Sequence, residues 1–338
     1  MAEPTVESME KSIYDDRSVA RVLGMRRTMF VVPAHLVPIL HHGCAAALAP
    51  RERSRLIRMV EDAGITSDGG AWVERVAEAT LRALTARGEA VATELTRDVP
   101  ELGERIPFGE GKRWQGEVGV STRMLFLLAT EGRIVRGRPR GSWTSSQYRW
   151  AAMSTWLPGG LRTVPRPRAR AELARRWLAA FGAGTTADLR WWTGWSAAHV
   201  RDALGEIGAV QVEVDRSPAF VLGDDVDPAP PPEPWAALLP ALDATVMGWF
   251  ERDWYLGPHR PALFDRNGNA GPTVWWEGRV VGGWAQRADG EIAYRLLEDT
   301  GREAKALIEA KAASLADWLG TTRVTPRFRT PLERELRG

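Results

Sequence analysis

The chain has one cysteine and no long apolar run, and each absence excludes a class of protein. A single cysteine, Cys44, among 338 residues excludes an internal disulfide framework and is typical of a reducing compartment. No apolar stretch approaches the length of a membrane span, and residues 1–4 lack the basic and apolar regions of a secretion signal. We therefore expect a cytoplasmic protein that does not contact membranes.

Metal and cofactor sites are not expected either. His41, His42 and Cys44 lie close together in the sequence, but adjacent histidines on a helix point apart and no matching ligand pair occurs elsewhere.

The chain has four tyrosines and 16 tryptophans. Most of the tryptophans are expected to fill cores, with one or two available to stack on bases. We expect a monomer with no metal and no cofactor.

Arginine is abundant and unevenly placed. Residues 133–176 contain eleven arginines and one carboxylate, Glu172, although the whole chain has a net charge of +2. Such a concentration of cations is expected of a protein that holds a polyphosphate backbone. The alternative is that arginine is simply the common cation of this chain and pairs with acids elsewhere.

Two stretches repeat one order of predicted elements, and this repeat gives the arginines a structural setting. The first copy is predicted from helical periodicity, helix-stop residues and short β-rich runs. Its elements are a helix at residues 71–86 stopped by Gly88, a second helix from Thr93, a glycine-rich basic loop at 108–119, a third helix at 122–130 capped by Ser121, and strands at 134–135 and 143–144 around a loop at 137–141.

The second copy follows about ninety residues later. Its elements are a helix at residues 171–181, a second helix from Thr186, a third helix capped by Ser196, and strands at 210–214 and 219–222. Leu95 corresponds to Leu189, and Glu94 to Asp188. Because an internal repeat must match twice, it is stronger evidence than one motif. The order is that of a winged helix-turn-helix, so we predict an α+β fold with tandem winged-helix units and a C-terminal α+β segment.

This interpretation divides the chain into four parts. A strand at residues 28–32 and a helix from Pro33 belong to the first part, and residues 162–170 form a stiff basic tether between the two winged units. The last part contains a hairpin at 273–284 and a helix at 301–319. The predicted parts are an N-terminal partial winged-helix segment (1–60), a winged helix (70–150), a second winged helix (165–227) and a C-terminal α+β part (235–338).

The first winged unit is the expected DNA contact. Its third helix carries Arg123 on the exposed side, its wing carries Arg136, Arg138 and Arg140, and its glycine-rich insertion carries Lys112. Backbone phosphates are usually met at such positions. The wing of the second unit is surrounded by acids instead: Asp215, Asp224, Asp225 and Asp227.

Three segments carry a resemblance to a known family. They are Met25-Arg26-Arg27-Thr28, Asp243 to Trp249 with Arg252 to Leu256, and Asn267 to Pro272 followed by Gly278 to Trp284. They resemble the winged-helix proteins related to AlkZ and YcaQ, bacterial glycosylases that remove alkylated purines and unhook interstrand crosslinks. The first segment is similar to that family's Arg-Gly-Thr segment with Arg27 in place of glycine, and we expect Arg26, Arg27 and Thr28 to contact DNA.

The resemblance also implies a catalytic pair that this sequence does not contain. In the family a Gln-x-Gln or Gln-x-Asp segment precedes the Arg-Gly-Thr segment by tens of residues, whereas none of the 25 residues before Arg26 is glutamine. Gln115-Gly116-Glu117 has the spacing, but it is predicted to lie in a loop. The chain is therefore either an N-terminally shortened relative or one that binds without catalysis, and we assign no catalytic residue.

Four polar residues of the C-terminal part stand in an apolar neighbourhood: Asp243, Arg252, His259 and Asn269. They form either a buried hydrogen-bond network or the floor of a DNA-facing cleft.

The leading hypothesis is therefore a DNA-binding protein that contacts duplex DNA mainly through its phosphates. The first alternative is a DNA glycosylase that removes alkylated or crosslinked bases, so enzyme activity is left open. The second alternative is a protein-interaction module, whose signature is a wing with arginines neutralised by acids of the chain itself.

Overall fold

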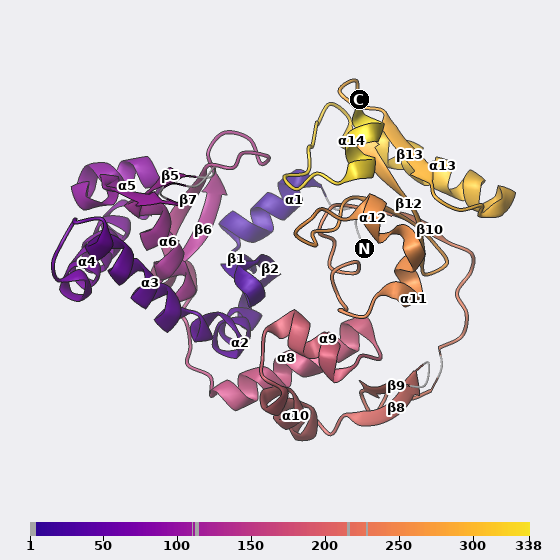
Figure 1. Ribbon diagram of the computed structural model, residues 1–338, viewed down its shortest axis with the longest axis horizontal. Coiled ribbons are helices and arrows are strands. Elements are labelled where there is room, and N and C mark those ends of the chain that lie inside the picture. Colours follow the sequence, from indigo (N-terminus) through magenta and orange to yellow (C-terminus); the bar gives the residue numbers. More distant parts are fainter. Residues whose placement is uncertain (1–4, 110, 112–114, 215–216, 228) are drawn as a thin grey trace. The chain divides into compact units, whose positions relative to one another are not determined.

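The computed structural model describes residues 5–109, 111, 115–214, 217–227 and 229–338, and Figure 1 shows its ribbon. The chain divides into two compact units: unit 1 is Met1–Arg176 with Thr193–Ile207, and unit 2 is Trp177–Trp192 with Gly208–Gly338. Both units combine helices with antiparallel strands, so the predicted α+β class is correct. Within these described ranges, no helix has the length and apolarity needed to cross a membrane.

Unit 1 is built around one five-stranded sheet with the order β2-β1-β6-β7-β3. A second, two-stranded sheet pairs β4 with β5. Its elements are α1 (Val6–Glu10), η1 (Lys11–Asp15), β1 (Val19–Leu23), η2 (Met25–Arg27), β2 (Met29–Pro33), η3 (Ala34–Leu36), α2 (Val37–Gly43), η4 (Ala45–Ala47), α3 (Ala49–Asp62), α4 (Gly69–Arg87), β3 (Glu89–Ala90), α5 (Ala92–Asp98), η5 (Pro100–Gly103), β4 (Arg105–Phe108), β5 (Gly116–Gly119), α6 (Val120–Thr130), β6 (Ile134–Pro139), β7 (Tyr148–Ala152), α7 (Met153–Trp156), the start of α8 (Arg166–Phe181) and α10 (Ala197–Glu206).

The core of unit 1 follows the predicted helical periodicity. Val73, Val76 and Leu84 of α4 are fully buried and pack with Met124 and Leu128 of α6. Burying such a side chain contributes about 1.5–3 kcal/mol relative to leaving it exposed. These contacts hold α3, α4 and α6 together as one helical layer.

Two predictions for the third helix and its preceding insertion are wrong. Helix α6 starts at Val120 with Gly119 at the N-cap, so Ser121 lies in the first turn and is not the cap. The insertion is not only a loop, because β4 and β5 pair through Ile106 and Val118. The side chain of Ile106 is buried in the core of unit 1, which anchors this hairpin and places Gly116 at the start of a strand.

The wing is longer than predicted. Strand β6 continues to Pro139, and β7 starts only at Tyr148, so the strand predicted at residues 143–144 is wrong. The backbone N–H of Arg140 donates to the carbonyl of Gln147 at 2.7 Å and closes a loop between them. Glycine and hydroxyl side chains dominate this loop, and they favour a turn over a strand.

A strand that the sequence pattern did not reveal joins the N-terminal segment to the wing. Strand β1 pairs with β2 along its length and with β6 through Arg21 and Arg136. The predicted strand at residues 28–32 is present as β2, one residue later. The N-terminal segment thus shares a sheet with β6 and β7, while the four-part division of the chain stays a prediction.

The second copy begins earlier than predicted. Helix α8 starts at Arg166, so the second half of the predicted tether is helical, with Pro167 in the first turn where its missing N–H costs nothing. Ser196 caps α10 as predicted, accepting from the N–H of His199 at 3.2 Å. The second helices of the two copies also begin in the same way. The carboxylate of Asp188 accepts a hydrogen bond from the backbone N–H of Thr185 at 2.9 Å, and that of Glu94 accepts one from the backbone N–H of Val91 at 2.8 Å.

Unit 2 is built on a four-stranded antiparallel sheet with the order β10-β11-β12-β13. Helix α13 covers it, with Ala304 and Ile308 packed on Val274 and Val281, and it occupies the residues predicted. Its elements are the end of α8, α9 (Thr186–Thr193), β8 (Val210–Val214), β9 (Ser217–Val221), β10 (Ala236–Leu239), α11 (Asp253–Leu256), η6 (Gly257–His259), α12 (Arg260–Leu263), β11 (Thr273–Trp276), β12 (Arg279–Gln286), β13 (Ile292–Leu296), α13 (Gly301–Leu319) and α14 (Pro331–Arg337).

Candidate nucleic-acid interface

One face of the unit 1 sheet carries a row of cationic and aromatic side chains. Arg21, Arg136 and Trp150 lie opposite one another on β1, β6 and β7, so their side chains share a face. The guanidinium of Arg136 lies 4.9 Å from the ring centroid of Tyr148 and 5.3 Å from that of Trp150, and Arg21 lies 4.4 Å from Tyr148. Stacking on aromatic rings fixes the orientation of these planar cations. The sheet therefore presents a preorganised basic surface.

The wing residue Arg138 is neutralised by the N-terminal helical segment. Its guanidinium pairs with Glu10 of α1 at 3.0 Å and with Asp15 of η1 at 2.9 Å. It also lies 4.7 Å from the ring centroid of Tyr14, whose hydroxyl accepts from Arg21 at 3.1 Å. In this conformation Arg138 is held by the chain itself.

Arg140 is in a different position. It directly follows β6, its side chain is exposed, and it makes no ion pair within the described ranges. An exposed arginine at the edge of a wing offers several donors to a phosphate. Of the three arginines predicted to contact DNA in the wing, Arg140 is the one with an exposed side chain. Lys112, the predicted contact in the insertion, lies outside the described residues.

A second cationic group surrounds a buried carboxylate between α3 and α6. Glu52 on α3 is only 6% exposed and forms an ion pair with Arg27. Arg123 on α6 was predicted to be exposed, but it is half-buried because α3 packs on α6. Its burial, with Arg55 and Arg27 nearby, lowers the pKa of Arg123, and its Nε atom has no hydrogen-bond partner in the described structure. Arg27 thus pairs with Glu52, and Arg123 lies within electrostatic range of Glu52, Arg55 and Arg27. The surplus of positive charge favours an anion.

One departure from the resembling family lies at a position with a left-handed backbone. Arg26 and Arg27 both have a left-handed backbone, with φ of 52° and 63°, a region that favours glycine. The turn is closed by the N–H of Thr28, which donates to the carbonyl of Met25 at 2.9 Å. Glycine, which the resembling family has at the position of Arg27, is the residue that this backbone prefers. In this chain Arg27 adopts the same backbone and forms an ion pair with Glu52.

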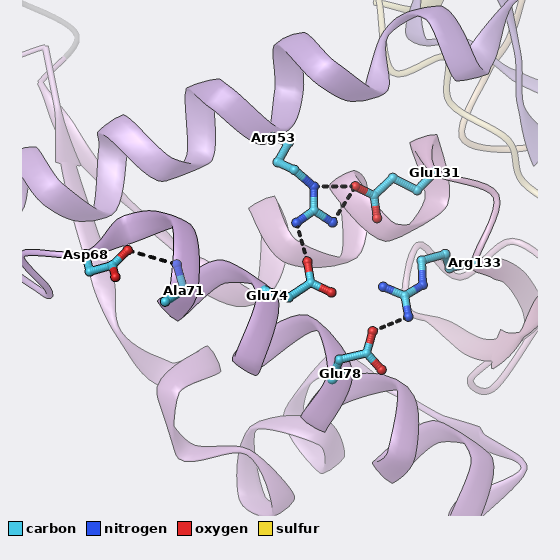
Figure 2. Close-up of polar contacts among 7 residues, drawn as sticks. All are labelled: Arg53, Asp68, Ala71, Glu74, Glu78, Glu131 and Arg133. Carbon is cyan, nitrogen blue, oxygen red and sulfur yellow. Dashed lines mark hydrogen bonds and ion pairs between the residues drawn. The ribbon is translucent and has the colours of Figure 1, made fainter.

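Two arginines, Arg133 of the basic stretch and Arg53 outside it, hold elements of unit 1 together. Figure 2 shows Arg133 beside Glu78 of α4, and Arg53 of α3 between Glu74 and Glu131. Both contacts of Arg53 are 2.7 Å long. The hydrogen bond from Arg133 holds the pKa of Glu78 below its ordinary value. Arg53 and Arg133 therefore stabilise the packing of unit 1 through ion pairs.

Arginines at the end of the stretch are also paired. Arg175 and Arg176 both contact Glu172 on α8, at 2.9 and 2.7 Å, and Arg149 lies 3.9 Å from Glu94. The alternative interpretation of the arginine concentration is therefore correct for these positions. Fewer of these arginines are therefore available to an anionic ligand than the sequence suggests.

The four polar residues singled out in the C-terminal part do not form one network. Within the described structure no hydrogen bond joins any two of them, and each has its own surroundings. Asp243 accepts from the N–H of Thr245, His259 pairs with Glu298 at 3.1 Å, Asn269 donates to Asp265, and Arg252, 3% exposed, lies 4.6 Å from the ring centroid of Trp191.

Metal-binding side chains are not grouped. In the portion of the chain that the structure describes, no three histidine, cysteine, aspartate or glutamate side chains could hold one ion. Cys44 is buried, and burial raises the pKa of its thiol to about 12, which keeps it protonated.

Comparison with known proteins identifies the family. A family model described as DNA glycosylase AlkZ-like matches residues 1–318. The fold is similar to that of the DNA glycosylase AlkZ from Streptomyces sahachiroi, with a TM-score of 0.71, 23% sequence identity, and coverage of 97% of this chain and 86% of that chain. No curated protein sequence matches at a significant level. The chain belongs to the AlkZ-like DNA glycosylase family.

Proposed function

We propose that this protein is a DNA glycosylase that binds duplex DNA through backbone phosphates and releases alkylated bases. The match of the family model to residues 1–318 carries the proposal. It favours catalysis, the first alternative from the sequence, over DNA binding alone. We assign DNA contacts to Arg26, Arg27, Thr28, Arg123, Arg136 and Arg140, with Arg138 joining them once its acidic partners are displaced, and we expect the protein to act as a monomer.

The proposal includes two winged-helix units. The first consists of α4, α5 and α6 with β6 and β7, and the second of α8, α9 and α10 with β8 and β9. Matched details support this pairing, because Leu95 and Leu189 are both fully buried and the acids before them cap their helices in the same way. The exposed wing arginine Arg140 lies in the first winged-helix unit, so we assign the wing contact with DNA to that winged-helix unit.

Base release tests the proposal directly. A duplex treated with a methylating agent is incubated with the protein, and abasic sites are measured as strand breaks after hot alkali. We expect breaks that accumulate with time and that fall when both Arg123 and Arg140 are replaced by alanine. Duplex binding without any breaks would reduce the function to DNA binding alone.

Two changes in the wing are expected to alter duplex affinity in opposite directions. Arg140→Ala is expected to weaken duplex binding severalfold and to reduce the slope of log affinity against log salt by about one, because one phosphate contact is lost. The double variant Glu10→Gln and Asp15→Asn is expected to strengthen binding and steepen that slope, because it frees Arg138. Fluorescence anisotropy across a salt series measures both; an unchanged slope in both variants would exclude a phosphate-binding wing.

A protein-binding role is the second candidate, and one observation favours it. The neutralisation of Arg138 by Glu10 and Asp15 is the feature expected of a wing that does not meet DNA. The same acid-removing double variant separates the two roles. A wing that serves another protein gains no duplex affinity when these acids are removed.

A further inference from the structure

The tip of the wing exposes a single large aromatic side chain. Trp143 lies in the loop between β6 and β7 and is 41% exposed. Its indole has no hydrogen-bond or ring partner in the described ranges. Trp254, which is even more exposed at 57%, packs against the rings of Trp249 and Tyr255. Trp143 is therefore a partly exposed aromatic side chain that forms no ring contact or hydrogen bond in the described part of the chain.

The loop is shaped to hold this side chain outward. The N–H of Arg140 donates to the carbonyl of Gln147 at 2.7 Å at the base of the loop, and the N–H of Ser145 donates to the carbonyl of Ser142 at 3.0 Å beneath the tip. The Ser142 hydroxyl also bonds that of Thr144 at 2.8 Å, on the other side of Trp143. These bonds fix the chain reversal, so less entropy is lost when the tip meets a partner.

The charge around the tip defines the partner. The loop itself contains no carboxylate, because none occurs between Glu131 and Glu172 in the sequence. The exposed Arg140 stands at the base of the loop, within electrostatic range of Glu94. A base-paired duplex matches both features of this hairpin: its phosphates suit the arginine, and its stacked bases suit the aromatic side chain at the tip. Proteins that bend or open DNA insert apolar side chains between base steps, and an enzyme that acts on a base must first take it out of the stack.

We infer that Trp143 is a wedge that enters the base stack at the lesion and fills the space left by the extruded base. The inference rests on the proposed function, because only base extrusion creates that space. Arg140 holds the neighbouring phosphates while the indole stacks on the exposed bases. The preferred ligand of the tip is thus a duplex with a vacated base position.

The test compares two fluorescein-labelled duplexes that differ at one position, where one carries a tetrahydrofuran abasic analogue. We expect the wild-type protein to prefer the abasic duplex, and Trp143→Ala to lower its affinity for that duplex about tenfold, as expected for the loss of base stacking. Affinity for the intact duplex should change less than twofold. Trp143→Phe should keep most of the preference, and Ser146→Ala, an exposed position of the same loop, should behave as wild type.

A 2-aminopurine placed beside the analogue gives an independent readout. Its fluorescence should change on binding of the wild type and of Ser146→Ala, but much less with Trp143→Ala. An undiminished preference in Trp143→Ala, or an equal loss on both duplexes, would overturn the wedge while duplex binding by the wild type still supports the proposed function. A wild-type protein that binds neither duplex refutes both.

Discussion

Replacing Glu52 with glutamine is expected to lower the free energy of unfolding by about 2 kcal/mol. The Glu52 side chain is 6% exposed and pairs with Arg27, and the guanidinium groups of Arg55 and Arg123 are close by. Glutamine keeps the volume and an acceptor but removes the charge that holds these cations together. Loss of a fully buried pair costs about 3–5 kcal/mol, and the smaller figure follows because Arg27 is 40% exposed.

Urea unfolding followed by circular dichroism measures this change. Glu117→Gln is the matched control, because Glu117 forms an ion pair with Arg105 in which both side chains are about 60% exposed, and its loss should cost less than about 1 kcal/mol. Sulfate should restore part of the stability of Glu52→Gln and stabilise the wild type less, because the anion replaces the missing carboxylate. Equal sulfate effects on both proteins would contradict an anion site at Glu52.

Local sequence patterns were sufficient for the elements with strong periodicity. The helix at residues 301–319 and the hairpin at residues 273–284 are predicted where they occur, because both depend mainly on neighbouring residues. The cap at Ser196 was found for the same reason.

The predictions failed where distant segments meet. Arg138 and Glu10 are 128 positions apart, and no local signal links a wing arginine to an N-terminal acid. Arg123 was expected to be exposed because helical periodicity places it opposite Met124 and Leu128, but α3 covers that side of α6. Residues 19–23 are apolar except for Arg21, so no alternation of polar and apolar side chains marked β1, and Arg21 was missed with it.

Acidification from pH 7.5 to 5 is expected to destabilise unit 1 through His41. The His41 side chain is 9% exposed. Gly132 packs against it so closely that a Cβ added at Gly132 would lie 2.6 Å from the Cε1 atom of His41. Burial, with smaller effects of His42 and Arg166, lowers the pKa of His41 from 6.5 to about 4. The folded protein therefore keeps this imidazole neutral at pH values where the unfolded chain protonates it.

The sign and size of the effect follow from that difference. Below pH 6.5 the unfolded state binds a proton that the folded state does not bind until about pH 4, so the free energy of unfolding falls as the pH is lowered through this range. Between pH 7.5 and 5 the loss is about 2 kcal/mol, since one unit of pKa difference corresponds to about 1.4 kcal/mol. Glu78 and Glu172, whose pKa values lie below their ordinary 4.5, lose their contributions only at lower pH.

His41→Leu should abolish the pH dependence of unfolding between pH 7.5 and 5, because leucine fills the buried site without a titrating group. Urea unfolding at several pH values measures this slope. His42→Gln is the control: it keeps the buried imidazole of His41 and removes a neighbour whose effect is second to burial, so most of the slope should persist. If the His41→Leu protein retained the wild-type slope, a different titrating group would be responsible, and His41 would not be held neutral by the packing around Gly132.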